Sequence, residues 1–249
     1  MFQTGPGKNL TGFVHAEYHY TEEEVMKVHK SISLGKKNQP LCVTKLFVSV
    51  CSPDFGSSWT AGRQILTVGH NRTEAVWSGI GDFDVVWDWQ RSRWFMVTSK
   101  MRGAASYHKT AAPASWRKWD GEEFTRDHFF EDSERFKDVN GDKLPNGEHP
   151  AISWNRFLQS WLMVWNGYNG HIYISSAARL PEWEPARILI EADHQNNPLT
   201  KHWYPTLISA HLGDRLGERH LHLYWREFPD GPGPYSIFRK VEIELVELP

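Results

Sequence analysis

The chain has 249 residues, and 28 Lys plus Arg stand against 30 Asp plus Glu for a formal net charge of −2. This balance gives no electrostatic reason to expect nucleic acid or an anionic membrane as a partner, and no apolar run approaches the roughly 20 residues that span a bilayer. The 13 tryptophans, 13 phenylalanines and 8 tyrosines are an unusual supply of flat side chains, which either pack between sheets or stack on sugar rings.

A sequence repeat runs through the middle of the chain. Residues 83–97 align without a gap with residues 150–164, an offset of 67 residues that pairs Trp87 with Trp154. Each copy reads as a strand, a polar turn and a second strand, because Val, Ile and Trp flank a short run of Asp or Asn, Arg and Gln. A looser third copy begins at Pro205, 55 residues after the start of the second. Hairpins repeated in this way predict the blades of a β-propeller.

The chain is therefore expected to be one all-β domain over residues 1–249. Its strands are predicted in four blade groups near residues 10–67, 82–126, 149–191 and 203–246. The repeat is longer than the 40–45 residues of WD-type blades, so these are not WD repeats.

A turn motif lies in the first group. Residues 52–59 read Ser-Pro-Asp-Phe-Gly-Ser-Ser-Trp and fit the S-x-D-x-G-x-[ST]-W pattern of the Asp-box, a hairpin turn on the outside of propeller blades. In such a turn the Asp caps backbone N–H groups and the Gly adopts a positive φ. The motif bears on fold and not on catalysis.

Five segments resemble secreted bacterial and fungal five-bladed propellers related to arabinanase and β-xylosidase-like glycoside hydrolases and to endo-D-arabinanases. These segments are residues 12–17, 30–34, 81–88, 149–155 and 203–207. The resemblance implies a five-bladed propeller, of which this chain represents about four blades. It also implies acid/base catalysis by carboxylates on an arabinose- or xylose-containing polysaccharide, an extracellular location and a glycan partner. The protein is expected to be a monomer without a cofactor. No metal is expected, because His220 and His222, which lie on one strand face, have no third ligand.

The chain departs from the family pattern in two places. An N-terminal blade, which in arabinanase-like enzymes supplies the aspartate base, is missing, so the chain is expected to be truncated there, and residues 1–12 do not read as a signal peptide. Residues 35–51 interrupt the family pattern before the Asp-box and are interpreted as an insertion or an unspliced intron.

The expected catalytic residues are Asp82, Glu148 and Glu17. Asp82 resembles the aspartate that raises the pKa of the acid and orients it, and Glu148, which precedes His-Pro, resembles the general acid. Glu17 is the rival acid. Each has a plain alternative: Asp82 could cap a turn, Glu148 could be a solvated turn residue, and Glu17 could face outward from its strand.

The first residues of successive repeats, Asp82, His149 and Tyr204, are expected to point toward one central pocket. Aromatic residues of segment 165–168, together with Trp203 and Tyr204, are interpreted as sugar platforms or as core. The expected substrate-binding residues are His15, Asp84, His149, Trp165, Asn166, Trp203, Tyr204 and Arg226. The alternative function is a non-catalytic carbohydrate-binding propeller or an inactive remnant of an enzyme.

Overall fold

The computed structural model describes most of the chain. The described residues are 2–3, 10–19, 43–52, 58, 63–66, 77–79, 82–107, 115–127, 133–194, 200–211, 217–229 and 235–246. For residues 2–79 it describes backbone, with the side chains of Phe13, Ser58, Ile65 and Leu66. The predicted all-β class is confirmed for this part of the chain, where the one helical element is the short 3-10 helix η1 (Ser99–Met101).

The strands form four sheets in chain order. The first sheet contains β1 (Phe2–Gln3), β2 (Leu10–His19), β3 (Val43–Ser52), β4 (Arg63–Leu66) and β5 (Trp77–Gly79), and the second contains β6 (Phe83–Asp88), β7 (Arg93–Thr98), β8 (Arg102–Ser106), β9 (Trp116–Trp119) and β10 (Phe124–Asp127). The third contains β11 (Gly147–Asn155), β12 (Ser160–Gly167), β13 (Ile172–Ala177) and β14 (Arg187–Ile190), and the fourth contains β15 (Lys201–Ser209), β16 (His220–Phe228) and β17 (Ile237–Glu244).

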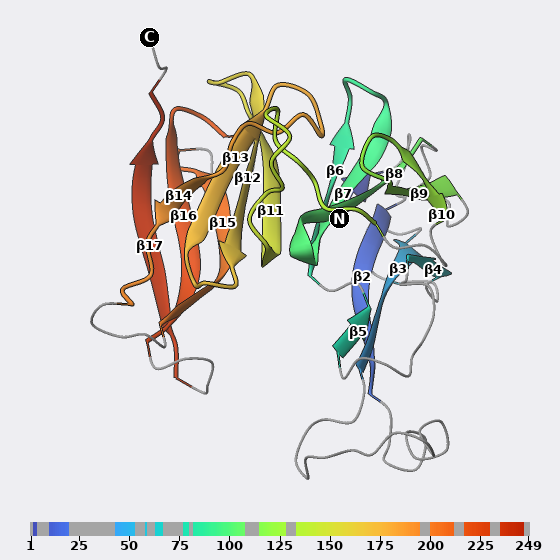
Figure 1. Ribbon diagram of the computed structural model, residues 1–249, viewed down its shortest axis with the longest axis horizontal. Helices are drawn as coiled ribbons and strands as arrows, with labels where there is room; N and C mark the ends of the chain where they lie inside the picture. Colours follow the sequence, from blue (N-terminus) through green and yellow to red (C-terminus); the bar gives the residue numbers. More distant parts are fainter. Residues whose placement is uncertain are drawn as a thin grey trace.

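Neighbouring strands within the second, third and fourth sheets are antiparallel and follow one another in sequence. The sheets stand side by side, from the blue first sheet through green and yellow to the red fourth sheet (Figure 1). Strand β11, which begins the third sheet, lies between β6 and β15, the first strands of the sheets on either side. The beginnings of three sheets therefore meet in one region.

Strands in the middle of this stack are buried on both faces. In β7, Trp94 and Met96 pack toward the first sheet with Ile65 and Leu66, whereas Phe95 and Val97 pack toward the third sheet. The same alternation divides β12, in which Leu162 and Val164 pack against the fourth sheet and Trp161, Met163 and Trp165 against the second. Because successive strand residues point to opposite faces, a strand between two sheets needs apolar residues at every position.

The sequence repeat corresponds to a structural repeat. Trp87 lies edge to face against Trp94, with ring centroids 5.3 Å apart at 71°, and Trp154 lies against Trp161 at 5.5 Å and 71°. The turns agree as well: Asp88 accepts the N–H of Arg91, and Asn155, which aligns with Asp88, accepts the N–H of Leu158. A local side-chain cap of this kind fixes a tight turn.

Two predicted features fall at the edge of the described residues. Residues 43–51 belong to the segment interpreted as an insertion, and they form most of β3, which pairs with β2 along ten residues and with β4. Residues 35–42 lie outside the described residues. Of the predicted Asp-box only Ser52 and Ser58 are described, so its hairpin also lies outside them.

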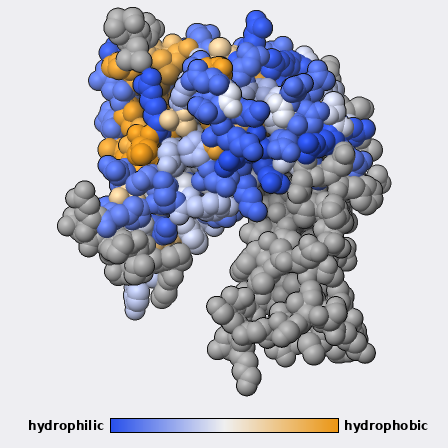
Figure 2. Space-filling model, viewed as in Figure 1, coloured by the Kyte–Doolittle hydropathy of each residue, from blue (hydrophilic) through white to orange (hydrophobic). Residues whose placement is uncertain are grey.

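The surface differs between the two ends of the stack. Apolar side chains gather over the fourth sheet, at the left of Figure 2, and the visible surface over the second sheet is mainly hydrophilic. The exposed apolar residues of β17 and its flanks include Tyr235, Ile237, Phe238 and Val241. Within the described ranges, no helix is long and apolar enough to cross a membrane.

Candidate functional site

The first strands of three sheets share an irregular backbone at the same point. In β11, Glu148 pairs with Asn166 and Ala151 with Val164, so two residues, 149 and 150, oppose one. The same shift interrupts β15 between Trp203 and Thr206. Such a β-bulge re-aims the side chain of its first residue.

The residues at these points have left-handed backbone conformations. Asp82, directly before β6, has φ 40°, His149 has φ 50° and Tyr204 has φ 54°. Positive φ is uncommon outside glycine and costs free energy of order 1–3 kcal/mol, and it recurs here at three aligned positions. Ser92 and Gln159, which are aligned in hairpin turns, share it, so the recurrence follows the structural repeat.

The side chains of Asp82, His149 and Tyr204 lie together. His149 Nε2 lies 3.5 Å from Asp82 Oδ1, and the ring centroids of His149 and Tyr204 are 3.9 Å apart. Trp203 lies beside them, with its ring centroid 5.5 Å from that of His149. His149 is buried, with 8% of its surface exposed, whereas Tyr204 is 52% exposed. The expected convergence of Asp82, His149 and Tyr204 is thus present in the structure: a buried histidine lies between a partly exposed aspartate and an accessible ring.

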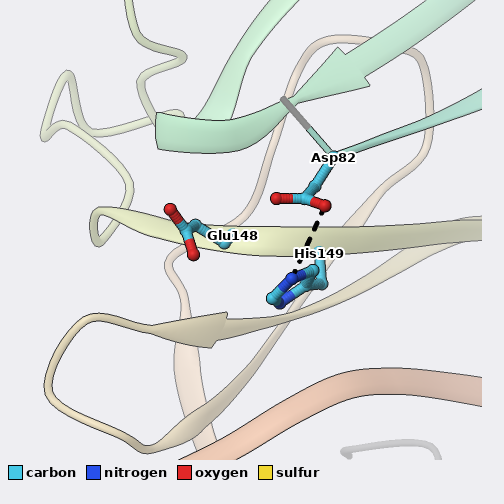
Figure 3. Close-up of side chains that lie close together, drawn as sticks. All are labelled: Asp82, Glu148 and His149. Carbon is cyan, nitrogen blue, oxygen red and sulfur yellow. Dashed lines mark ion pairs between the residues drawn. The ribbon is translucent and has the colours of Figure 1, made fainter. Parts of the chain in front are cut away.

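A second carboxylate joins this cluster. Glu148 precedes His149 on β11, and one carboxylate oxygen each of Asp82 and Glu148 and one ring nitrogen of His149 all lie within 4.8 Å of one another (Figure 3). Two carboxyl groups so close repel each other when both are ionised. These two oxygens and one nitrogen could serve as three ligands of a cation. A structural zinc site has four protein ligands, so the cluster provides one too few.

Asn166 fixes the orientation of His149. Its side chain is 2% exposed, and its Oδ1 lies 2.7 Å from His149 Nδ1. The amide oxygen accepts the Nδ1 proton, so Nε2 is the atom turned toward Asp82. A hydrogen bond between Nε2 and Asp82 then requires a second proton on the ring or a proton on the carboxyl group. Asn166 is predicted to bind substrate directly, but its side chain is buried and its amide oxygen contacts His149.

Tyr168, at the end of segment 165–168, completes the rim of the cluster. Burial, the negative charge of Glu148 and a hydrogen bond to Glu148, followed by the charge of Asp82, raise the pKa of Tyr168 to about 12, while Arg102 opposes the shift. The phenol is thus neutral at physiological pH and donates its proton to Glu148. Arg102 at the start of β8 was not predicted, because no motif marks it and it lies on the third strand of its sheet.

Replacing Glu148 with Gln should lower the pKa of Tyr168 from about 12 toward its ordinary value of 10. The substitution removes the negative charge that disfavours the phenolate, although the desolvation remains. The measurement is a titration of tyrosinate absorbance in the native protein and the variant, with Tyr168→Phe identifying the signal. An unchanged titration curve in the Glu148 variant would show that the two side chains are not in contact.

Two predicted ligand residues have structural roles instead. Trp165 has no exposed surface and its indole N–H donates to the carbonyl of Pro145, so it cannot be a sugar platform. Both carboxylate oxygens of Asp84 accept backbone N–H groups, that of Val85 at 2.9 Å and that of Ile152 at 2.8 Å. Asp84 therefore joins β6 to β11 and holds the second and third sheets together beside the site.

The remaining predicted residues lie apart from the cluster or beyond its description. Arg226 is exposed, donates to Ser236 Oγ and covers the ring of Phe228 at 4.7 Å. His15 and Glu17 lie on β2, where they pair with Phe47 and Lys45 of β3. Their side chains lie outside the described residues, so their predicted roles stay predictions.

The site and the sheets define a class: an all-β protein with antiparallel sheets stacked side by side and a carboxylate–histidine–tyrosine cluster where three first strands meet. No family model matches the chain, and no curated protein matches it either.

Solved structures resemble it only distantly. An α-L-arabinofuranosidase from Podospora anserina in complex with cellotriose is 11% identical over 83% of this chain and 60% of that one, with a TM-score of 0.49, and a GH62 hydrolase in complex with xylotriose is 14% identical over 80% and 60%, with a TM-score of 0.45. The catalytic domain of a Coprinopsis cinerea GH62 α-L-arabinofuranosidase is 12% identical over 79% and 84%, with a TM-score of 0.30. The chain spans 60% of the length of the first two, and scores below 0.5 do not establish that it shares their fold or activity.

Proposed function

We propose that this protein is glycoside hydrolase-like and acts on an extracellular polysaccharide that contains arabinose or xylose. The observation that carries the proposal is the pair of carboxyl groups, Asp82 from the second sheet and Glu148 from the third, with oxygens within 4.8 Å beside the exposed rings of Tyr168 and Tyr204. Glycoside hydrolysis needs carboxyl groups grouped at one sugar site, and pentose rings need flat surfaces to stack on.

In this proposal Glu148 is the acid that protonates the glycosidic oxygen, and Asp82 is its charged neighbour. His149 and Asn166 hold Asp82 in place, since His149 Nε2 lies 3.5 Å from Asp82 and Asn166 fixes the ring. The sugar would lie over Tyr204 and Trp203.

The hydrogen bond from Tyr168 favours the second candidate, a non-catalytic carbohydrate-binding protein. A phenol that donates to a carboxylate stabilises the ionised form, whereas a glycosidase acid has to carry a proton. Under this alternative the same rings hold a glycan, and the carboxylates accept hydrogen bonds from its hydroxyl groups.

An assay of reducing sugar released from arabinan, arabinogalactan and xylan separates the two candidates, with Asp82→Asn as the control. We expect release from at least one polysaccharide by the native protein and its loss in the variant. If the native protein releases none but still binds one of the polysaccharides, the binding function replaces the enzymatic one.

A further inference from the structure

A cavity of about 680 Å³ lies beside the β9–β10 turn of the second sheet, away from the Asp82 cluster. The end of β8, the β9–β10 turn and two segments near residues 137–141 and 181–182 line it. None of the residues of the candidate site lines this cavity, and its volume falls within the range of small-molecule sites.

The cavity presents one aromatic ring that is both accessible and fixed. Tyr107 is 59% exposed, and its hydroxyl accepts a hydrogen bond of 2.9 Å from Arg93 Nη1. Arg93 is itself immobilised, because its Nε lies 3.2 Å from Asp88 Oδ2 and its Nη2 donates to the carbonyl of Leu180 at 2.7 Å. A ring pinned by a buried cation loses little conformational entropy when a ligand stacks on it.

The two walls beside this ring are turns held by aspartates. Asp120 accepts the N–H groups of Glu122 and Glu123, and the bond from Glu123 is the largest of the causes that lower the pKa of Asp120 to about 2. Asp138 accepts the N–H groups of Asn140 and Asp142 at 2.9 and 3.0 Å. The cavity is therefore formed before any ligand arrives.

The charges around the cavity are of both signs. Glu122, Glu123 and Lys137 are exposed on its walls, and Arg91 is paired with Glu182 at 2.6 Å. A lining of this kind offers hydrogen-bond donors and acceptors, but it has no net positive potential that would attract an anion. Together with a flat ring, it matches a neutral, hydroxyl-rich chain.

We propose that this cavity is a second glycan-binding site, in which a neutral oligosaccharide segment stacks on Tyr107 and its hydroxyl groups bond to Glu122, Glu123 and Lys137. The site binds without reaction and holds a polysaccharide to the protein at a distance from the Asp82 cluster. The inference does not depend on hydrolysis, because the second site binds glycan whether or not the first one cleaves it.

The test is affinity electrophoresis in gels that contain arabinoxylan, arabinan or hydroxyethylcellulose, carried out in an Asp82→Asn background so that no polymer is cleaved. We expect Tyr107→Ala to weaken the apparent affinity for at least one of these polymers about fivefold or more, which is the loss typical of a central contact. Tyr107→Phe should retain the affinity because it keeps the ring. Tyr235→Ala is the matched control, since it removes another highly exposed tyrosine, two residues before β17 of the fourth sheet.

Equal retardation of the Tyr107→Ala and Tyr235→Ala proteins in every gel would overturn the proposal, and so would the absence of any retardation of the Asp82→Asn protein. A parallel gel contains anionic polygalacturonate, and a loss of affinity confined to that gel would overturn the neutral ligand class. Thermal melting of the three tyrosine variants distinguishes lost binding from lost folding. The gels measure binding and not hydrolysis. Absence of the proposed hydrolase activity would therefore not change the conclusion about the second site.

Discussion

Under the proposed hydrolase function, replacing Glu148 with glutamine should lower the rate of glycoside hydrolysis about 10²–10⁴-fold, which is the usual contribution of a general acid. Gln keeps the shape of the side chain and still accepts a hydrogen bond from Tyr168, but it cannot transfer a proton to the leaving oxygen. The kinetic measurement is kcat/KM on a pentose oligosaccharide that the native protein cleaves. Substrate binding by the variant should persist, because the rings of Tyr204 and Trp203 are unchanged.

Varying the leaving group of the substrate tests the acid role of Glu148 more directly. An aryl glycoside with an acidic phenol departs without protonation, so the loss in the Glu148→Gln protein should be much smaller on that substrate than on the oligosaccharide. Glu242→Gln, which alters an exposed carboxylate on β17, is the matched control and should leave both rates unchanged. An equal loss on both substrates would contradict the acid role and assign Glu148 to positioning.

Replacing Arg93 with alanine should destabilise the protein by about 3–5 kcal/mol, the cost of breaking a buried ion pair by removing one partner. Arg93 and Asp88 have side chains that are 3% and 0% exposed, and Arg93 also covers the ring of Phe124 at 4.8 Å. The variant leaves the Asp88 carboxylate buried without its cation and the Leu180 carbonyl without its donor. Urea denaturation, followed by tryptophan fluorescence, measures the loss.

Arg91 gives the comparison for this experiment, since it is two residues away in the same hairpin. It pairs with Glu182 at 2.6 Å, but the two side chains are 32% and 55% exposed to solvent, so Arg91→Ala should cost only about 0–1 kcal/mol. Arg93→Lys should recover some of the lost stability, because it restores a positive charge beside Asp88. The recovery should be incomplete, because an ammonium group cannot reach all three partners of the guanidinium group. Similar destabilisation by the two alanine variants would show that the buried pair contributes no more than the exposed one.

The repeat made much of the central architecture predictable. Aligned tryptophans in residues 83–97 and 150–164 have the same edge-to-face geometry, and aligned Asp88 and Asn155 cap the same turn. Local patterns of this kind are encoded within one hairpin, so a single sequence is enough to find them. The shared position of Asp82, His149 and Tyr204 also followed from the alignment of the repeats.

Burial within the stack could not be predicted in the same way. Trp165 and Tyr168 stand three residues apart and look equally suited to sugar stacking, yet Trp165 is enclosed and Tyr168 is on the rim. Which face of β12 meets a neighbouring sheet depends on how whole sheets pack, and apolar residues fill both faces. Asp84 gave a similar error, because its partner Ile152 lies 68 residues away on another sheet.

The three positive-φ positions also bear on how such a site can change. His149 and Tyr204 stand at bulges in β11 and β15, Asp82 stands directly before β6, and the three side chains are a histidine, a tyrosine and an aspartate. Each of these three side chains can thus be replaced by itself, which changes the charge, the proton donor or the aromatic surface of the site. The hydrogen-bonded register of the strands stays the same. In a scaffold of this kind, substitutions at the site leave the packing of the core unchanged. Ligand specificity can therefore change during evolution while stability is retained.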